Sequence, residues 1–505
     1  MLCAAVALMF YLVLQLPANA QPASQLESAA GGAGRTRILL VLPFDNRTGQ
    51  PSVDWIREAA ASLLSSRFAS AGFSPMSRSD RMYALDHLGL PESFQPSRAS
   101  ALKLAQTLDA DAIIVGSYIM DGNNLVAEAR VVDVPHLRMG LPVTARGEMH
   151  SMIDIFDGLA WQLTRQMDPH FSVSEDTFIA AGKGIRLDAF EQYIRGITEA
   201  DQAERLRHLK QAVTLSPDFA PAWMALGREQ YNGQQYEDAA STFAHISGSS
   251  PDGLEAGFYR GLSLLFSGRY PQAQEAFGAV ARELPLAEVL NNEGVAISRD
   301  GKDGSALFRQ AIAADLANPD YHFNLGVSLM RHSASAEAIA EMTQCLKLRP
   351  NDTEAQDLLK AWKQPPGTTA TASVSPGQQH PDPLERIERR FDEAAFRQAA
   401  GMMDQMEAAR MAALSPHDRA VKLAVQAQGY LDRGLILEAE LLYQSAKESD
   451  GSLVAAHLGL ARVHQRAGDL IAARKEVAQA LQLEPGNLSA QDLNRELAAQ
   501  PAPKQ

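Results

Sequence analysis

The sequence predicts an α/β N-terminal domain followed by an all-α superhelix whose helix pairs form two blocks. Strand-like and helix-like segments alternate between residues 37 and 168, and a set of small and aromatic residues recurs every 34 positions near the centre. A Pro-rich stretch then interrupts the helical pattern at residues 364–383. The chain has 505 residues, 46% of them hydrophobic and 21% charged, which is typical of a globular protein with about three domains.

The 34-residue register is clearest between residues 223 and 285. Trp223 opens it on the buried face of a first helix, and five pairs of identical residues follow. The Gly and Ala of each pair let two helices approach closely, the Phe fills the gap to the next helix pair, and the Pro ends the second helix. The repeat-structural residues are therefore Trp223, Gly227, Ala239, Phe243, Pro251, Gly261, Ala273, Phe277 and Pro285.

This period and these residues resemble the tetratricopeptide repeat, an antiparallel helix pair that stacks into a superhelix. The resemblance implies two repeat blocks, the second of which begins with a helix pair over residues 384–414. The composition between them predicts a flexible linker rich in Pro, Gly, Ser and Thr, and the C-terminal residues are expected to be a disordered tail. The expected bounds are 185–363 for the first block, 364–383 for the linker, 384–496 for the second block and 497–505 for the tail.

The N-terminal end has the pattern of a signal peptide. Residues 2–16 are apolar, and Ala18 and Ala20 match a signal-peptidase site, which predicts a leader over residues 1–20 that is cleaved after Ala20. The apolar run is short for a membrane span. We therefore expect a periplasmic or secreted protein with no membrane span after cleavage, and an uncleaved membrane anchor is the alternative. Residues 21–36 are small and polar, which is typical of a flexible spacer.

Residues 37–168 are expected to fold as a compact α/β domain. A buried strand over 38–42 precedes a helix over 53–73, and a strand over 112–119 leads into a hairpin turn at 121–124. The segments LLVLPFDN, WIREAAASLLSSRF and LDADAIIVGSYIMDGNNLVAEARVVDV resemble the TolB-like N-terminal domain. This resemblance implies an envelope-associated α/β fold and no particular activity.

No catalytic residue, metal site or cofactor is predicted. The sequence lacks HExxH, GxSxG and GxxxxGK[ST] motifs, and His457 and His464 alone are too few for a metal site. The Gly182-Lys183-Gly184 stretch lacks phosphate-loop spacing and is interpreted as a hinge. A net charge of −14 without a basic cluster argues against nucleic acid as a partner. Cys345 would be the single cysteine after loss of the leader, so no intramolecular disulfide is expected.

The predicted partner groove lies along the first helix of each repeat. Its positions follow from counting Trp223 as the fourth residue of a repeat, and the third repeat contributes Asn291, Val295 and Ser298. Because only one of the other positions is basic, an apolar or amphipathic peptide is the expected ligand. The alternative is that these residues pack on the α/β domain, on the second block or on a second copy of the chain. The other groove candidates are Met224, Arg228, Tyr231, Phe258, Leu262, Leu265, Phe323, Val327 and Met330.

Together these patterns predict an exported, non-catalytic adaptor or scaffold of the cell envelope that binds another protein through its repeats. The alternative is a sensor whose α/β domain binds a small ligand near Asp45 and the Asp121–Asn124 turn and signals through the repeats. A hydrolase whose active-site residues are distant in sequence is a third alternative.

Overall fold

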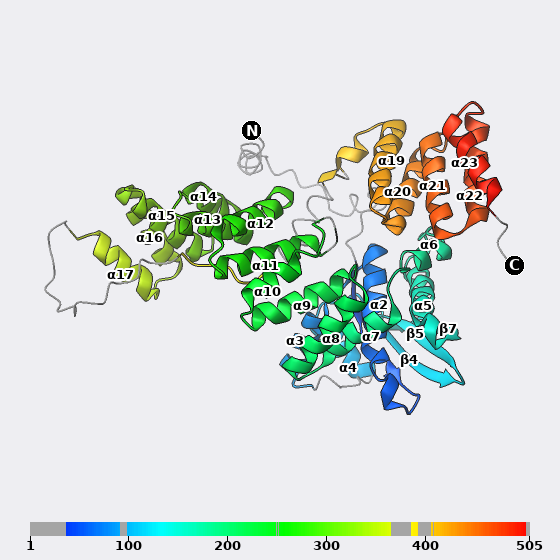
Figure 1. Ribbon diagram of the computed structural model, residues 1–505, viewed down its shortest axis with the longest axis horizontal. Coiled ribbons are helices and arrows are strands. Elements are labelled where there is room, and N and C mark those ends of the chain that lie inside the picture. Colours follow the sequence, from blue (N-terminus) through cyan, green and yellow to red (C-terminus); the bar gives the residue numbers. More distant parts are fainter. Residues whose placement is uncertain are drawn as a thin grey trace, which may run out of the picture.

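The computed structural model describes residues 37–90, 98–248, 250, 252–364, 385–391, 406–407 and 409–500. The predicted signal peptide, the spacer, nearly all of the linker and Pro251 lie outside the described residues. Figure 1 shows the α/β domain beside the start of the first repeat block, which extends to one side, while the second block lies on the other side.

The N-terminal domain contains a seven-stranded sheet within its described residues, with β3, β1, β4, β5 and β6 in that order. Strand β1 pairs in parallel with β3 and β4, whereas β4 and β5 form the predicted antiparallel hairpin, with Gly122 at positive φ in its turn. Strand β2 pairs with β4, and β7 pairs with β5. The strands are β1 (Ile38–Val41), β2 (Asp45–Asn46), β3 (Ser74–Pro75), β4 (Ala112–Asp121), β5 (Asn124–Asp133), β6 (Arg138–Met139) and β7 (Val143–Glu148).

Helices cover both faces of this sheet. Consecutive apolar residues of β1 point to opposite sides, so each face of the sheet has apolar side chains to bury. Leu39 packs into a core with α2 and α5, and Leu40 packs into a second core with α3 and α4. This confirms a strand buried on both faces. The sequence analysis missed α3 and β7. The helical segments are η2 (Pro51–Val53), α2 (Ile56–Ser70), α3 (Arg78–His87), α4 (Arg98–Thr107), η3 (Met149–Ser151), α5 (Met152–Met167) and α6 (Glu175–Ala180).

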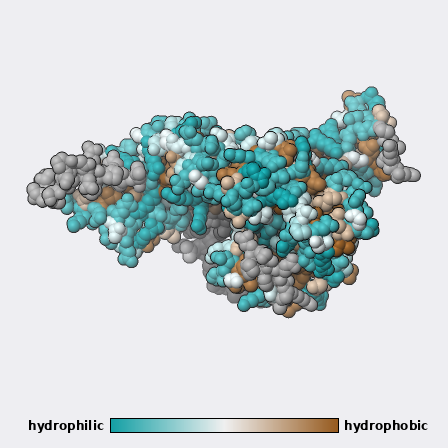
Figure 2. Space-filling model, turned by 60° about the horizontal axis from the view of Figure 1, so that its bottom comes forward, coloured by the Kyte–Doolittle hydropathy of each residue, from teal (hydrophilic) through white to brown (hydrophobic). Residues whose placement is uncertain are grey.

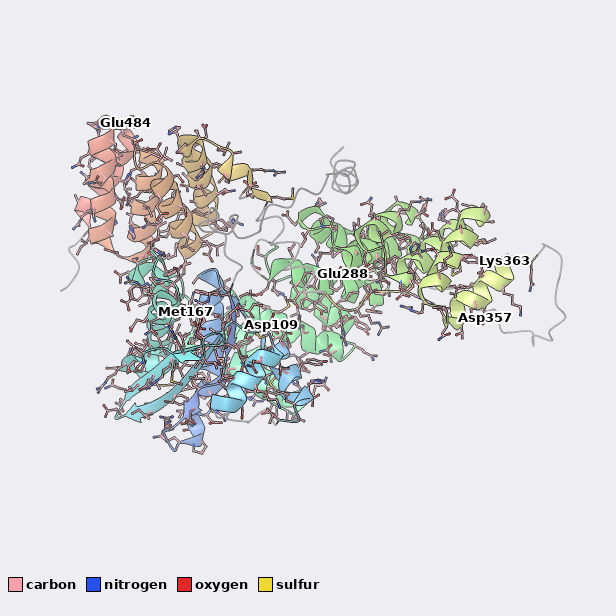
Figure 3. The ribbon with its side chains drawn as sticks, turned by 180° about the vertical axis from the view of Figure 1, so that it is seen from behind. Asp109, Met167, Glu288, Asp357, Lys363 and Glu484 are labelled. Atoms are coloured by element: carbon pink, nitrogen blue, oxygen red, sulfur yellow. The ribbon has the colours of Figure 1, made fainter. Side chains whose placement is uncertain are left out.

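The first repeat block is a continuous series of antiparallel helix pairs. Its first pair, α7 and α8, shares a hydrophobic core with the α/β domain, as Ile194 and Leu209 show. Helix α17 caps the far end, as predicted; Figure 3 labels Asp357 on it. The helices are α7 (Leu187–Thr198), α8 (Gln202–Leu215), α9 (Ala220–Asn232), α10 (Tyr236–Phe243), α11 (Gly253–Phe266), α12 (Tyr270–Glu283), α13 (Ala287–Arg299), α14 (Ser305–Ala314), α15 (Pro319–Arg331), α16 (Ser335–Leu348) and α17 (Thr353–Trp362).

The predicted small residues bring the two helices of a repeat together. Both Ala239 and Ala273 are fully buried. A Cβ atom added to Gly227 would lie 2.6 Å from the Phe243 ring, and one added to Gly261 would lie 2.7 Å from the Phe277 ring. Neither glycine position therefore has room for a side chain, which confirms the proposed reason for glycine.

The second block packs against the N-terminal domain through α6. Ala180 and Ala181 belong to the same apolar cluster as α20 and α21, and the backbone N–H of Ser174 donates a 3.1 Å hydrogen bond to the buried Glu440 carboxylate. Figure 1 shows α20 and α21 above α6. The helices are α19 (Pro416–Asp432), α20 (Ile436–Ser449), α21 (Val454–Ala467), α22 (Leu470–Leu483) and α23 (Leu488–Ala499).

Two predicted boundaries of the second block were wrong. Residues 385–391 are not helical, although a helix pair was expected over residues 384–414. Helix α23 continues to Ala499, and Leu497 is fully buried against α21 and α22, so the expected disordered tail cannot begin at residue 497. In the described residues, no helix is both long and apolar enough for a transmembrane span. The face in Figure 2 is mainly hydrophilic, with small scattered hydrophobic areas.

Candidate functional site

A groove along the first helices of the last repeats holds a segment of the same chain, Glu385–Phe391. This segment contacts α11, α13, α15 and α17, which are first helices of successive pairs. The observation agrees with the expectation that first helices line the binding face. We call this surface the repeat groove and its occupant the groove segment.

Two asparagines hold the backbone of the groove segment. The Asn324 side chain accepts the Arg386 N–H at 2.6 Å and donates to the Arg386 carbonyl oxygen at 2.7 Å. Asn292 does the same for Glu388, at 3.0 and 2.7 Å. Alternate residues that bond to one side through both N–H and C=O have the geometry of a β-strand. The groove segment is therefore extended.

A third asparagine connects the two. Asn291 donates to the Arg386 carbonyl at 3.1 Å and accepts from Asn324 at 2.7 Å. The Asn291, Asn292 and Asn324 side chains are fully buried. Since a buried amide without a partner costs about 1–3 kcal/mol, these side chains need a peptide backbone, or water in its place, beside them. Within the groove segment they bond only to backbone atoms, so they select an extended chain and not its sequence.

Arg386 supplies a sequence-specific contact. Its guanidinium lies 3.7 Å from the Phe323 ring centroid and bonds to Asp320 at 2.7 Å, to Asp352 at 2.6 and 2.8 Å, and to Glu354 at 2.9 Å. Burial alone would lower the pKa of Arg386, but these hydrogen bonds outweigh burial and raise it. The same contacts, led by the hydrogen bond from Arg386, lower the pKa of Asp352. The pocket therefore selects a charged, planar guanidinium.

Glu385 occupies a neighbouring basic pocket. Its side chain is 2% exposed, and its carboxylate bonds to Arg331 and Ser298. Arg299 lies 3.9 Å from the carboxylate and donates to the Glu385 carbonyl at 3.0 Å. An acidic residue immediately before an arginine is thus matched by groove charges of opposite sign.

The rest of the groove segment makes apolar and aromatic contacts. Ile387 packs on the core of the repeats, and the Phe391 ring lies 5.6 Å from the Phe258 ring. The Arg389 guanidinium lies 5.1 Å from the Phe266 ring centroid. These contacts extend the interface from α17 back to α11.

The predicted groove residues are mostly core residues. Phe258 and Phe323 each contact the groove segment, and so does Ser298. Arg228 instead pairs with Glu255 and lies over the Tyr259 ring. The remaining positions pack within the repeats, fully or partly buried: Met224, Tyr231, Leu262, Leu265, Val327 and Met330.

The expected apolar or amphipathic peptide stays a prediction for an external partner, because the segment bound in the groove belongs to the chain itself. This segment lies within the predicted second block, 384–496, so Phe258, Phe323 and Ser298 follow the alternative of packing on that block.

The occupied part of the groove has a different chemistry. Its centre is polar and charged, and its occupant is extended, whereas an amphipathic helix or an apolar peptide was expected. The missed signal lies one position beyond the residues chosen. Asn292 and Asn324 stand 32 residues apart, as do Arg299 and Arg331, so the same polar residues recur at equivalent places in successive repeats.

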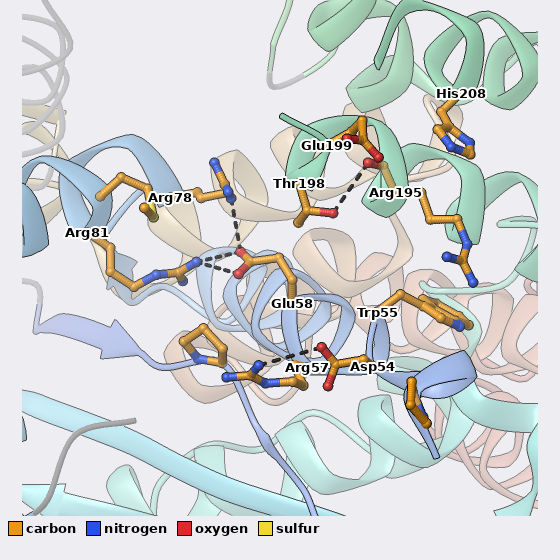
Figure 4. Close-up of a pocket in the computed structure, with 13 residues that line it drawn as sticks. Asp54, Trp55, Arg57, Glu58, Arg78, Arg81, Arg195, Thr198, Glu199 and His208 are labelled. Atoms are coloured by element: carbon orange, nitrogen blue, oxygen red, sulfur yellow. Dashed lines mark hydrogen bonds and ion pairs between the residues drawn. The ribbon is translucent and has the colours of Figure 1, made fainter. Parts of the chain in front are cut away.

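A second hollow lies where the α/β domain meets the first helix pair. This cavity of about 410 Å³ is lined by several arginines, shown in Figure 4. Arg81 forms two hydrogen bonds to Glu58, at 2.5 and 2.7 Å, and Arg57 lies 3.6 Å from Asp54. The Arg81–Glu58 pair joins α3 to α2, and the Arg57–Asp54 pair is a local contact at the start of α2, so both have a structural role.

The site expected for a small-ligand sensor is not assembled around this cavity. Asp45 lies on β2 opposite Ser117 of β4 and pairs with Arg47 at 2.9 Å, and the Asp121–Asn124 turn begins four residues further along β4. Neither lines the cavity. His457 and His464 likewise do not form a metal site, since His457 bonds to Glu476 and to the Gly451 carbonyl. Within the described residues, no group of three or more potential metal ligands occurs.

Comparison with known proteins identifies the repeats. Residues 298–353 match the tetratricopeptide repeat family. No curated protein matches the chain significantly. Similar solved structures include MamA 41-end from Desulfovibrio magneticus RS-1, with 22% identity over 33% of this chain and 99% of that one, at a TM-score of 0.31.

Two further structures cover other shares of the chain. YrrB, described as a TPR protein with an unusual peptide-binding site, has 14% identity over 40% of this chain and 99% of its own, at a TM-score of 0.31. The LpoB C-terminal domain from Salmonella enterica has 20% identity over 25% of this chain and 92% of its own, at a TM-score of 0.21. Residues 298–353, which include α15 of the repeat groove, therefore form a tetratricopeptide repeat, and the neighbouring helices are arranged in similar antiparallel pairs.

Proposed function

We propose that this protein is a non-catalytic adaptor that binds an extended segment of another protein in the repeat groove. The observation that carries the proposal is the pair of asparagines, Asn292 and Asn324, each of which bonds to both the N–H and the C=O of one peptide residue. Side chains that replace the partner strand of a sheet in this way bind a peptide backbone of any sequence.

We also propose that the adaptor is exported and acts in the cell envelope, with a TolB-like N-terminal domain. The apolar run before Ala20 and the resemblance of residues 37–168 support this part. Expression in a diderm bacterial host, cell fractionation and N-terminal sequencing test it. A periplasmic chain that begins at Gln21 is the expected result, and a cytoplasmic chain that keeps its leader would overturn the export proposal.

Peptide selection tests the groove. Because residues 385–391 occupy the groove, the parent chain for this test carries Glu385→Arg/Arg386→Glu, which weakens the bound segment. A displayed library of random heptapeptides is selected on this full-length parent chain, and the selected peptides are titrated by fluorescence anisotropy against the parent and against its Asn292→Ala/Asn324→Ala variant. Loss of both asparagine side chains should weaken peptide binding at least tenfold, because each side chain makes two hydrogen bonds to the peptide backbone. The matched control is Gln465→Ala/Glu496→Ala, which removes an exposed 2.8 Å side-chain hydrogen bond in the second block.

The control variant should bind the selected peptides like the parent chain, and circular dichroism should show that both variants are folded. Peptides that bind the Asn292→Ala/Asn324→Ala variant as tightly as the parent chain would place the binding surface outside the repeat groove and overturn the proposal.

A further inference from the structure

We propose that the groove segment is an internal competitor, and that the external partner carries a segment of the same chemistry. That segment is extended, has a Glu-Arg pair at its start, an aliphatic residue third and an aromatic residue seventh, as in Glu385–Phe391. This inference rests on the proposed function, because it names the ligand of the same groove.

Charge complementarity specifies the first two ligand residues. Glu385 lies among Arg299, Arg331 and Ser298, and its side chain is nearly inaccessible to solvent. The next residue, Arg386, meets three carboxylates and the face of an aromatic ring. Exchange of the two charges would place like charges together in both pockets, which costs affinity and gives specificity.

The groove also contacts the side chain of the fourth ligand residue. The Glu388 carboxylate accepts a 3.0 Å hydrogen bond from the Asn318 side chain, in addition to the backbone bonds to Asn292. Its contact is less demanding than those at the first two positions, since it is a single hydrogen bond from a neutral amide and no opposite charge faces the carboxylate in it. The ligand pattern is therefore strongest at its N-terminal end and at its terminal aromatic residue.

The covalent link makes the groove segment a competitor. Twenty residues separate Gln364, at the end of the first block, from Glu385. A covalent connection of this length holds the segment near the groove at an effective concentration of the order of millimolar, so an internal segment of modest intrinsic affinity still fills the groove. An external peptide must then compete, and its apparent affinity falls in proportion to the fraction of empty groove.

The position of the second block does not depend on the groove segment. It is held on α6 by contacts of its own, including the Ser174–Glu440 hydrogen bond. Displacement of the groove segment can therefore occur while both blocks remain folded and docked, and the exchange is local.

A charge-swapped segment tests the proposal in the full chain. The variant Glu385→Arg/Arg386→Glu keeps the net charge and every groove residue but puts each charge beside its like. A labelled peptide with the wild-type sequence of residues 385–391 should bind this variant at least tenfold more tightly than the wild-type chain, by fluorescence anisotropy. The peptide with the same two residues swapped is the control and should bind neither chain.

Each other result has a distinct meaning. Equal affinity of the wild-type peptide for both chains would show that the segment does not compete, which overturns this inference and leaves the proposed function standing. Absence of binding to both chains overturns the ligand pattern; the proposed function then stands if peptides selected from the library still depend on Asn292 and Asn324, and fails if they do not.

Two further measurements complete the test. Light scattering of the wild-type chain should give a monomer; a dimer that dissociates in the swapped variant would assign the occupant to a second copy and overturn internal competition. If the swapped variant does not fold, Glu385→Arg alone, which introduces repulsion only from Arg299 and Arg331, replaces it and is judged by the same tenfold criterion.

Discussion

Small residues set the distance between the two helices of a repeat, and the stability that is lost when one of them is enlarged can be measured. Gly261→Ala adds a methyl group 2.7 Å from the Phe277 ring, so we expect the variant to lose about 1–3 kcal/mol of stability through overpacking. The control is Gly429→Ala on α19, where an added Cβ meets nothing within 4 Å. Alanine should be neutral or stabilise there by roughly 0.5–1 kcal/mol. Urea unfolding measures the change in the free energy of unfolding of both variants. Equal changes for the two would contradict the packing argument.

A buried ion pair makes the stability of the second block depend on pH. His457 Nδ1 lies 2.6 Å from Glu476 Oε2, and the Lys447 ammonium lies 2.8 Å from the other oxygen. Burial alone would raise the pKa of Glu476, but the hydrogen bonds from His457 and Lys447 outweigh it and lower the pKa to about 2. The hydrogen bond to Glu476 raises the pKa of His457 above its usual 6.5.

The two shifts act in opposite pH ranges. The contribution of Glu476 is present above its ordinary pKa of 4.5 and is lost as the pH falls toward 2, whereas that of His457 is present below pH 6.5 and is lost as the pH rises through its raised value. His457→Gln should therefore lower the melting temperature most between about pH 4.5 and 6.5 and progressively less above this range. A difference from wild type that grows steadily up to pH 9 would show that the pair is not ionised as described.

At the scale of elements, patterns that depend on local packing were predictable and contacts between distant segments were not. The helix pairs and the β4–β5 hairpin follow from spacing and turn residues, as Gly122 and Gly261 show. The groove segment was expected to be helical because it falls in residues 384–414, a stretch rich in Met and Ala, which suit a helix. Hydrogen bonds from Asn292 and Asn324, far away in the sequence, override that weak preference.

The site itself was predictable only in outline. Counting from Trp223 identified the correct helices and, among the contacts, Asn291, Ser298 and Phe323. It missed Asn292 and most of the charged residues, because the direction in which a side chain points within a superhelix depends on stacking of the repeats, which a single period does not specify.

Hydrogen exchange of the backbone amides tests whether the groove segment is stably held. The amides of Arg386 and Glu388 donate to asparagine side chains, so their hydrogen exchange should be slow in the wild-type chain. The Glu385→Arg/Arg386→Glu variant should exchange both amides much faster, while α2 keeps its protection. Mass spectrometry of the exchanged peptides measures this, and fast exchange in the wild-type chain would contradict a stably held segment.

In the whole molecule, the turn after α6 joins the three parts. A Cβ added to Gly182 would lie 2.0 Å from Asp157, whose carboxylate pairs with Arg67 at 2.8 Å inside the α/β domain. The predicted hinge at Gly182–Gly184 is thus packed on a buried ion pair. Burial raises the pKa of Asp157 to about 6, against the opposing effect of Arg67.

Gly182→Ala should therefore disturb the connection between the α/β domain and both blocks. The methyl group would separate the buried charges, and an uncompensated buried pair is expected to cost about 3–5 kcal/mol. Thermal unfolding followed by circular dichroism tests this. The control is Gly486→Ala, where an added Cβ meets nothing within 4 Å; equal melting temperatures for the two variants would mean that the turn adapts freely.

Asn292 and Asn324 relate the number of repeats to the length of the chain bound in the groove. Asn292 and Asn324 belong to successive repeats and hold Glu388 and Arg386, so the ligand runs opposite to the order of the repeats and advances by one dipeptide per repeat. A dipeptide of extended chain is about 6.6 Å long. Insertion of one more helix pair with an equivalent asparagine should lengthen the stretch of extended backbone held in the groove by two residues, so the number of such repeats sets the length of chain that the groove holds.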